Sequence, residues 1–407
     1  MKHLITIALL FITVSCFSQP GNDITIGKID TVRSKILNET RRIWVYVPAS
    51  AGSKMYTPQQ YPVVYLLDAP AHFHSVTGLI QQLSSVSGNT VLPEMIVIGI
   101  QNTDRTRDLT PTHSTESPFG QSPESLKTSG GADKFLSFIE KELMPYVDAT
   151  YPVAPYKMLV GHSFGGLFAM HALLSKPDLF NSYIAIDPSL WWDKQALAKK
   201  AIIALQQNKF PSKPLYIAIA NVLNTRNEIK EIEKDTSIFG IGMRMAFRLT
   251  KTMDQYKKAN QPWHWKYYAD DSHGSVPLIA EYDALRTFFK GHHLPFTANP
   301  EEMDAAMFKN HYQNISLLMG YKVPPPEMKI NRMGYAFMEL KMFDKAYEFF
   351  KLNIENYPAS FMAHDSMGDY YLAKGEKEKA IEHFKKALRL KDFPGTREKL
   401  EKLTRSQ

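Results

Sequence analysis

Residues 156–174 read YKMLVGHSFGGLFAMHALL, with an apolar run before Ser163 and a second apolar stretch after it. The first run has the length and composition of a short strand that is buried on both faces, and the second is typical of a helix. Ser163 is therefore predicted to lie on the turn between them. Gly161 and Gly165 stand on either side, where strand and helix pass so close together that a Cβ atom has no room.

The sequence Gly161-His162-Ser163-Phe164-Gly165 has the G-x-S-x-G pattern of a nucleophile elbow. Such a turn lifts the serine hydroxyl above the carboxyl end of the sheet, and the N-terminus of the following helix favours developing negative charge. Because a free serine hydroxyl is a weak nucleophile near neutral pH, this chemistry needs a base that takes its proton. For the motif alone, a tight turn without a chemical role is the alternative.

Short apolar runs recur along the chain and are separated by segments of helix length, which is typical of a parallel sheet buried on both faces. These runs are residues 61–68, 94–100, 156–161, 182–187, 214–220 and 263–269. Residues 24–48 instead alternate on both sides of the sequence NET, which predicts two antiparallel strands and a hairpin. The pattern predicts a doubly wound, mostly parallel α/β sheet over residues 19–295.

His273 follows the last predicted strand, in the sequence DDSHGSV. In chains with a nucleophile elbow the base comes last and lies after the final strand, so His273 is the predicted base. The rival histidines, which do not follow that strand, are His72, His74, His113, His162, His171 and His264. His162 directly precedes Ser163, and we expect its side chain to point the other way.

A carboxylate is expected to orient the imidazole of His273. The acid usually follows the strand before the one that leads to the histidine, here residues 214–220, and the next segment offers Glu228 and Asp235. We predict Glu228 as the acid, with Asp235 as the alternative. Less usual candidates lie at the preceding strand end and in the loop before the histidine, namely Asp187, Asp270 and Asp271.

Five stretches together resemble the putative esterase family of α/β-hydrolases. They are YPVVYLLD (61–68), NTDRTRDLTP (102–111), LVGHSFGGLFAMHALL (159–174), IDPSLWWD (186–193) and HGSVPLIAEYDALRTFF (273–289). The resemblance covers residues 40–290 and is strongest to the siderophore-esterase branch. It implies the α/β-hydrolase fold and hydrolysis of a carboxylic ester, through an acyl-enzyme on Ser163 with His273 as base.

Members of this family include enterochelin and other siderophore esterases, feruloyl and acetylxylan esterases, S-formylglutathione hydrolases and mycolyltransferases. The resemblance therefore implies a siderophore lactone, or a feruloyl or acetyl ester that is small or linked to a glycan, as substrate. It implies no cofactor, and some members of the siderophore branch work with a serine and a histidine alone. The alternative is a binding or scaffold protein that has kept the fold and lost turnover.

The oxyanion-hole residues are also predicted from the resemblance. The family usually has glycine after the aspartate of YLLD and takes an N–H donor from the next residues, whereas this chain reads Asp68-Ala69-Pro70. Pro70 has no N–H to donate. We therefore expect one donor from Phe164, directly after the serine, and the other from Ala69, with Ala71 as the alternative.

Trp191 and Trp192 follow a predicted strand end, where loops reach the mouth of the predicted site. Aromatic side chains there would stack on a catechol, phenolic or sugar ring, and packing in the core or a lid is the alternative. Arg105 would attract an anionic ligand. An ion pair with Asp104 or Asp108 is the alternative for this arginine.

The C-terminal part of the chain repeats with a period of 34 residues. The recurring pairs are Gly334 and Gly368, Ala346 and Ala380, and Phe350 and Phe384. This period, with small and aromatic residues at these positions, resembles the helix-turn-helix units of tetratricopeptide repeats. We predict such repeats with a capping helix over residues 329–407. Residues 296–328 are predicted to be a linker with a helix and the proline-rich sequence KVPPPEM.

Two repeats alone bury little surface, because such arrays usually need about three units for stability. We therefore expect them to lean on residues 296–328 or on the α/β domain. They either bind a protein partner or only pack against the rest of the chain.

The first residues have the order of a secretory signal, with Lys2, an apolar run and then small residues. The run is too short to cross a bilayer comfortably. We expect removal of residues 1–18 and export to the periplasm or the medium, with a lipoprotein anchored at Cys16 as the alternative. Cleavage removes the only cysteine, which leaves no disulfide, thiolate nucleophile or cysteine-based metal site.

The formal net charge is +7 over 407 residues. Lysine and arginine are interspersed with glutamate and aspartate along most of the chain, so a solvated surface explains them better than a nucleic-acid interface does. We therefore expect an ester substrate and no nucleic acid, and a protein partner for the repeats remains one of the two alternatives given above.

Overall fold

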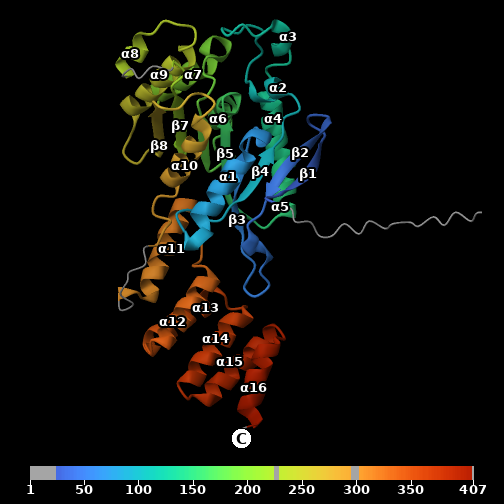
Figure 1. The fold of residues 1–407 in the computed structure, drawn as a ribbon, viewed down its shortest axis with the longest axis vertical. Helices are drawn as coiled ribbons and strands as arrows, with labels where there is room; N and C mark the ends of the chain where they lie inside the picture. The colour runs from blue at the N-terminus through green and yellow to red at the C-terminus, as the bar shows by residue number, and fades with distance from the viewer. Residues whose placement is uncertain (1–23, 224–228, 295–301, 406–407) are drawn as a thin grey trace, which may run out of the picture.

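The computed structural model describes residues 24–223, 229–294 and 302–405, and the predicted signal sequence with Cys16 lies outside them. In these residues an eight-stranded sheet forms the upper part of the molecule, and a stack of helices forms the lower part (Figure 1). The strand order is β1-β2-β4-β3-β5-β6-β7-β8. The strands are β1 (Lys28–Ser34), β2 (Glu39–Tyr46), β3 (Tyr61–Leu66), β4 (Ile96–Ile100), β5 (Val153–His162), β6 (Ser182–Ile186), β7 (Leu215–Ala220) and β8 (Trp263–Tyr268).

The sheet is antiparallel at one edge and parallel elsewhere. β1 and β2 form the predicted hairpin, β2 also pairs antiparallel with β4, and all further neighbours are parallel. Every residue of β3, β4, β6 and β7 is buried, which explains why their sequences are continuous apolar runs. The predicted doubly wound α/β fold is confirmed.

Helices cover both faces of the sheet. α1 (Ala69–Ser84) and α10 (Val276–Phe288) belong to the apolar core on one face, and α6 (Phe164–Ser175) belongs to the core on the other. The remaining α-helices of this domain are α2 (Arg105–Leu109), α3 (Pro123–Leu126), α4 (Ala132–Phe138), α5 (Met144–Thr150), α7 (Trp192–Gln206), α8 (Ile229–Lys234) and α9 (Ile241–Tyr256). In the described ranges, no helix combines the length and apolar character needed to cross a membrane.

Residues 302–405 form six helices. They are α11 (Ala305–Met319), α12 (Glu327–Glu339), α13 (Phe343–Asn356), α14 (Phe361–Ala373), α15 (Lys377–Leu390) and α16 (Pro394–Arg405). A Cβ atom on Gly334 would lie 2.5 Å from the Phe350 ring, and one on Gly368 would lie 2.5 Å from the Phe384 ring. The period of 34 residues therefore arises because the same glycine–phenylalanine contact between two helices occurs twice.

The segment predicted as a capping helix forms α16, which is held to α14 by polar contacts. Lys399 Nζ donates to Asp365 Oδ2 and Asp369 Oδ2, both at 2.7 Å, and Thr396 Oγ1 donates to Asp365 Oδ1 at 2.6 Å. The buried carboxylate of Asp365 is thus satisfied by the last helix.

The repeats lean on the sheet domain. One apolar cluster contains residues of β5, β6 and α10 together with residues of α11, α12 and α13. Glu327, which is buried at the start of α12, accepts from the Thr57 N–H at 2.7 Å and from the Ser360 hydroxyl. Lys391 Nζ donates to the Lys54 carbonyl at 2.8 Å.

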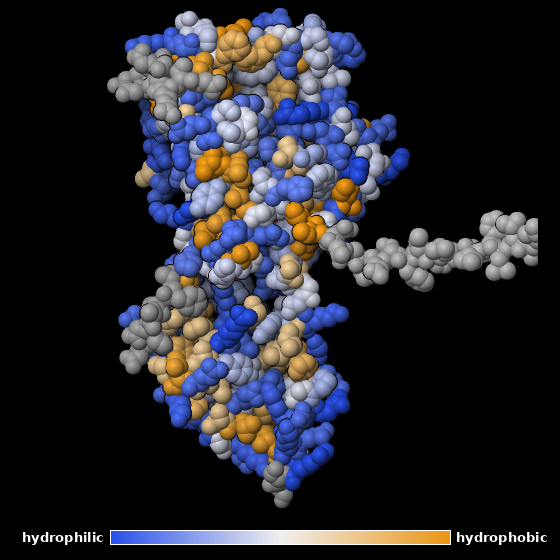
Figure 2. Space-filling model, in the orientation of Figure 1, coloured by the Kyte–Doolittle hydropathy of each residue, from blue (hydrophilic) through white to orange (hydrophobic). Residues whose placement is uncertain are grey.

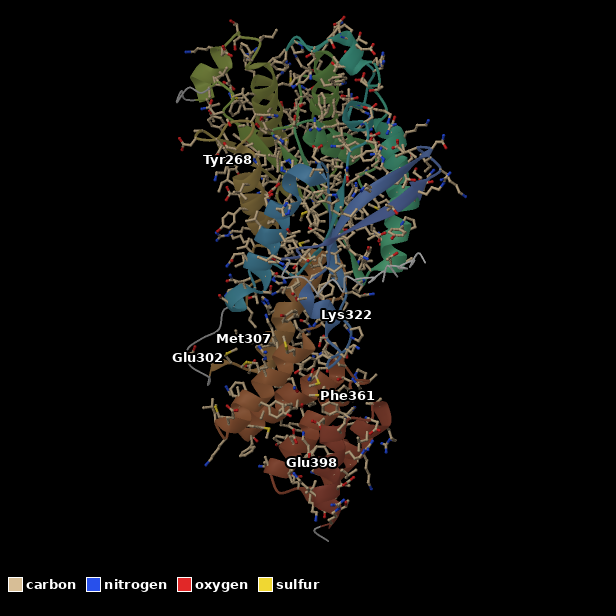
Figure 3. The ribbon with its side chains drawn as sticks, turned by 45° about the vertical axis from the view of Figure 1, so that its right-hand side comes forward. Tyr268, Glu302, Met307, Lys322, Phe361 and Glu398 are labelled. Carbon is tan, nitrogen blue, oxygen red and sulfur yellow. The ribbon has the colours of Figure 1, made fainter. Side chains whose placement is uncertain are left out.

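This junction lies at the amino ends of the parallel strands, because Thr57 precedes β3, whereas Ser163 follows β5 at the carboxyl ends. Figure 3 shows Met307 and Lys322 at the waist of the molecule, between Tyr268 of the sheet domain and Phe361 of the repeats. The face in Figure 2 is mostly hydrophilic, with separate apolar groups on both parts. The repeats therefore stand away from the end of the sheet that carries Ser163.

We predict that Glu327→Ala lowers thermal stability without changing turnover of a small ester. The substitution leaves the buried Ser360 hydroxyl and the Thr57 N–H without their acceptor, which costs about 2 kcal/mol and lowers Tm by a few degrees. Thermal denaturation and hydrolysis of p-nitrophenyl acetate at 25 °C measure the two effects. Glu348→Ala, at an exposed position of α13, is the control and should leave both unchanged. If Glu327→Ala lowered turnover at 25 °C, the junction with the repeats would not be independent of the site at Ser163.

Candidate active site

Ser163 has a strained backbone at the turn from β5 to α6, with φ 61° and ψ −117°. Its N–H donates to the Ile186 carbonyl and its carbonyl accepts from the Leu167 N–H, both at 2.9 Å. A Cβ atom on Gly161 would lie 2.2 Å from the Gly165 carbonyl oxygen, so glycine is required there. The turn has the geometry that the sequence predicts for a nucleophile elbow.

Ser163 and His273 line the same cavity, which has a volume of about 320 Å³. The hydrogen bond that Ser163 Oγ makes within the described part of the chain is to Ser189 Oγ, at 3.3 Å. Four aromatic side chains line the wall, namely Phe119, Phe164, Trp191 and Phe239, and the polar side chains of Arg105, Gln121, Asp187 and Ser189 also reach it. The cavity can therefore place an apolar or aromatic group beside a serine hydroxyl and an imidazole.

Asp187 is the carboxylate that pairs with His273. His273 Nδ1 donates to Asp187 Oδ2 at 2.5 Å, which leaves Nε2 as the acceptor nitrogen of the neutral ring. Asp187 directly follows β6 and has φ 38°. Its other oxygen accepts from the Ala220 N–H at 3.1 Å, so the carboxylate is fixed between the ends of β6 and β7.

The acid predicted from the sequence is therefore corrected. Asp235 accepts from Ser237 and from Arg244 Nη1 at 2.8 Å, so it pairs within its own segment and not with His273. The hydrogen bonds from Ser237 and the charge of Arg244 lower the pKa of Asp235. Glu228 lies outside the described residues. The signal for the correct carboxylate was its position as the first residue after a buried strand, in the sequence IDPSLWWD.

His162 does not point away from the site, contrary to our expectation. The centroid of its ring lies 4.4 Å from that of His273, with 40° between the ring planes. Two other rival bases have separate partners, since His171 Nε2 lies 2.8 Å from Asp133 Oδ1 and His113 Nδ1 lies 3.1 Å from the Ser129 carbonyl. His162 lies on the face of β5 that packs against α1, where the ring of His72 is 5.5 Å away, and the loop that carries His273 reaches the same face.

The two predicted oxyanion donors occupy equivalent places, because Phe164 and Ala69 are the first residues of α6 and α1. N–H groups in the first turn of a helix have no acceptor within the helix. Phe164 lines the cavity, whereas Ala69 is fully buried and follows Asp68, whose φ is 54°. The alternative donor, Ala71 N–H, is already bonded to the Asp68 carbonyl at 2.9 Å.

Arg105 lines the cavity but pairs with neither Asp104 nor Asp108. Its Nε and Nη2 donate to the two carboxylate oxygens of Asp68, at 2.8 and 2.9 Å. Burial alone would raise the pKa of Asp68, but the hydrogen bonds and charge of Arg105 hold it below its ordinary value. The guanidinium carbon lies 5.3 Å from the centroid of the Phe164 ring. Arg105 is thus a fixed cation at the cavity wall.

The two tryptophans have different roles. Trp191 lines the cavity and lies beside Phe119 and Phe164, at centroid distances of 4.9 and 5.7 Å. Trp192 is buried, and its Nε1 donates to the Thr112 carbonyl at 3.1 Å. The prediction that Trp192 binds substrate is wrong, because the first residue of α7 faces the core.

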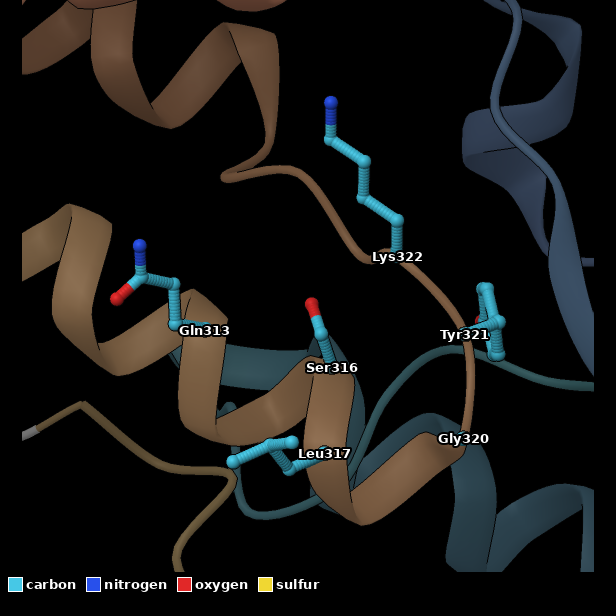
Figure 4. Close-up of a pocket in the computed structure, with 6 residues that line it drawn as sticks. All are labelled: Gln313, Ser316, Leu317, Gly320, Tyr321 and Lys322. Carbon is cyan, nitrogen blue, oxygen red and sulfur yellow. The ribbon is translucent and has the colours of Figure 1, made fainter.

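A second hollow lies on α11, far along the chain from Ser163 (Figure 4). It is lined by Gln313, Ser316, Leu317, Gly320, Tyr321 and Lys322. Ser316 Oγ donates to the Tyr312 carbonyl at 2.6 Å, and the lining residues include neither a histidine nor a carboxylate. This hollow therefore has no serine–histidine pair of the kind that lines the cavity at Ser163. Within the described ranges, no group of three histidine, cysteine or acidic residues could hold a metal ion.

The strand order and the turn at Ser163 define an α/β-hydrolase. A family model described as putative esterase matches residues 34–275, which is more than half of the chain, so the protein belongs to the putative esterase family. A tetratricopeptide-repeat model matches residues 363–393, which contain most of α14 and all of α15. Both families agree with the resemblances in the sequence.

Several relatives are named as siderophore esterases. The chain is 32% identical to the ferri-bacillibactin esterase BesA of Bacillus subtilis, over 51% of this chain and 72% of the relative. It is 37% identical to the siderophore enterobactin esterase of Emericella nidulans over 34% of this chain, and spans about half of that protein, 49%. An IroE-like serine hydrolase from Shewanella oneidensis has a similar structure, with a TM-score of 0.66, 29% identity, and coverage of 81% of this chain and 99% of its own.

We predict that Asp187→Asn lowers kcat for p-nitrophenyl acetate by about 10²- to 10⁴-fold, because the amide cannot hold His273 in the same tautomer. Steady-state kinetics at constant pH measure the effect. Asp235→Asn is the control and should stay within about twofold of the unchanged protein. A larger loss from Asp235→Asn than from Asp187→Asn would show that the pairing described here is not the one used in turnover.

Proposed function

We propose that this protein hydrolyses carboxylic esters through an acyl-enzyme on Ser163, with His273 as base and Asp187 as its positioning residue. The observation that carries the proposal is the hydrogen bond between His273 and Asp187 in a cavity that Ser163 also lines. Membership of the putative esterase family and the siderophore-esterase relatives support it.

The first half of the reaction forms the acyl-enzyme. Ser163 Oγ leaves its contact with Ser189, gives its proton to His273 Nε2 and attacks the ester carbonyl carbon. The Phe164 N–H donates a hydrogen bond to the carbonyl oxygen as that oxygen becomes negative. When the tetrahedral intermediate collapses, the bond to the leaving alkoxide breaks, and His273 returns the proton to that oxygen.

The second half uses water in the same way. A water molecule gives a proton to His273 Nε2 and attacks the acyl carbon, and the proton then passes to Ser163 Oγ as the acid leaves. His273 is a cation during both halves. The carboxylate of Asp187 stabilises that cation and keeps Nδ1 as the donor nitrogen, so Nε2 remains available.

The wall of the cavity supports an acyl group with an aromatic ring. The ring of Trp191 lies at stacking distance from those of Phe119 and Phe164, so the wall offers aromatic faces and edges to a bound ring. The cavity volume of about 320 Å³ suits one substituted ring. Arg105 supplies a positive group for a phenolate or carbonyl oxygen. A catecholate siderophore ester has these features, as does a feruloyl ester, and the named relatives favour the siderophore.

We also propose that the protein is exported with removal of residues 1–18, which the order of charge, apolar run and small residues supports. N-terminal sequencing of the mature protein tests this, with Gln19 as the expected first residue. A mature chain that begins at Cys16 would support the lipoprotein instead.

A protein bound to the repeats would leave the cavity open, because the repeats contact the opposite end of the sheet.

We predict that a fluorophosphonate probe labels the protein at Ser163, since the probe reacts with an activated serine hydroxyl. Ser163→Ala should abolish both labelling and turnover of p-nitrophenyl acetate, whereas Ser189→Ala should keep labelling at Ser163. Mass spectrometry of the labelled peptide and steady-state kinetics measure the result. Turnover that persists in Ser163→Ala would remove the basis of the mechanism, and an unlabelled, inactive protein would favour the scaffold alternative.

We predict that Trp191 selects aromatic acyl groups. Comparing p-nitrophenyl benzoate with p-nitrophenyl acetate keeps the leaving group constant and changes only the acyl group. Trp191→Ala should lower the ratio of kcat/KM for benzoate over acetate by about tenfold, the equivalent of one stacking contact. Ile203→Ala, at an exposed position of α7, should leave the ratio unchanged. An unchanged ratio in Trp191→Ala would show that the acyl group does not reach this ring.

A further inference from the structure

A row of polar side chains runs from His273 into the space between α1 and α10. The ring of His162 lies 4.4 Å from that of His273, and the ring of His72 lies 5.5 Å from that of His162. His72 Nδ1 then lies 3.7 Å from Glu281 Oε1. The reaction proposed above uses only the first of these four residues.

Two polar atoms in this row are buried and have no hydrogen-bond partner among the described residues, namely His162 Nε2 and Glu281 Oε1. The other carboxyl oxygen of Glu281 accepts from the Ser75 hydroxyl at 3.0 Å. Buried polar atoms without partners are uncommon and cost stability. An apolar residue at position 162 would avoid that cost at this strand end, so the polar ring calls for an explanation other than stability.

His162, His72 and Glu281 are uncharged at neutral pH. Burial, together with the charges that His273 and His72 can carry, lowers the pKa of His162 to about 4. Burial also lowers the pKa of His72 and raises that of Glu281 to about 8. The three groups behind His273 therefore present polar but neutral surfaces to it.

The charged groups around His162 come from several elements. Arg105 of α2 donates to the His162 carbonyl at 3.3 Å and pairs with Asp68, which directly precedes α1. Asp187, after β6, pairs with His273. Because each carboxylate already has a cationic or donor partner, neither overcomes the effect of burial on His162.

We propose that His162 is a positioning residue for ester hydrolysis at Ser163, and that its ring is the wall on which the imidazole of His273 rests. The proposal depends on the function proposed above. The side chain of His273 is 47% exposed, and Asp187 holds only one of its ring nitrogens. A ring packed against it limits the remaining rotation and keeps Nε2 directed toward the Ser163 hydroxyl.

The wall has to be uncharged for this purpose. His273 becomes a cation in both halves of the reaction, and a second cation at this distance would repel it. A neutral aromatic ring tolerates an adjacent cation and attracts it weakly through its face. The interior position of His162 thus supplies a flat ring that stays neutral while its neighbour gains and loses a proton.

The test compares His162→Ala, which removes the wall, with His162→Phe, which keeps a flat ring and carries no charge at any pH. With p-nitrophenyl acetate, His162→Ala should lower kcat at least about tenfold and change KM by no more than about twofold. His162→Phe should keep kcat within about threefold of the unchanged protein. His74→Ala and His74→Phe, at an exposed position of α1, are the matched controls and should keep both constants.

Two readouts separate positioning from folding. Fluorophosphonate should label every molecule of His162→Ala at Ser163 at the end point, but at a rate that falls with kcat; a folding defect would lower the labelled fraction. The acid limbs of kcat/KM for the unchanged protein and His162→Phe should coincide above about pH 5, because neither ring is charged there.

Three results would overturn the proposal: full kcat in His162→Ala, a His162→Phe variant as slow as His162→Ala, or an acid limb displaced by about one pH unit in His162→Phe. Each of them leaves the esterase function standing if Ser163→Ala is inactive. Turnover that persists in Ser163→Ala would instead contradict the proposed function, whatever the variants at position 162 do.

Discussion

The close approach of β5 and α6 at Gly161 and Gly165 is the constraint on which the rest of the site depends. Since a Cβ atom would lie 2.2 Å from a carbonyl oxygen, the strand can turn directly into the helix only with glycine at position 161. Three consecutive residues then take three directions: the ring of His162 lies against His273, Ser163 lines the cavity, and Phe164 begins the helix. β6 pairs with β5, and its end therefore places Asp187 beside them.

Features set by local residue size and spacing could be predicted, whereas the choice of one partner among several candidates could not. The turn at Ser163 and the repeat contact of Gly334 with Phe350 each follow from residue size and spacing, so the fold class and the repeats were within reach. The sequence placed Asp187 among several candidate acids, but it did not indicate the backbone angle, φ 38°, from which Asp187 pairs with His273. Likewise Arg105 pairs with a carboxylate 37 residues away, because β3 and β4 are neighbours in the sheet.

A parallel sheet has two chemically different ends, and the chain uses both. The carboxyl ends carry Ser163, Asp187 and His273, and the amino ends receive the repeats through Glu327. The apolar cluster on the α1 and α10 face continues into α11 and α12, so the two parts share packing as well as hydrogen bonds. This explains how only two repeats with a capping helix remain folded, since a free array of that size buries too little apolar surface.

The carboxylates beside the cavity each have a partner, whereas the polar groups behind His273 are uncharged. Asp68 is held by Arg105 and Asp187 by His273, so each carboxylate near the cavity has a fixed partner. His162, His72 and Glu281, which lie deeper, are neutral near pH 7 because burial disfavours their charged forms. When His273 takes a proton, Asp187 is the partner that stabilises the new charge, and no neighbouring group in the row has to release or accept a proton in response. The site therefore changes its charge at one imidazole only, which suits a base that must gain and lose a proton twice in each turnover.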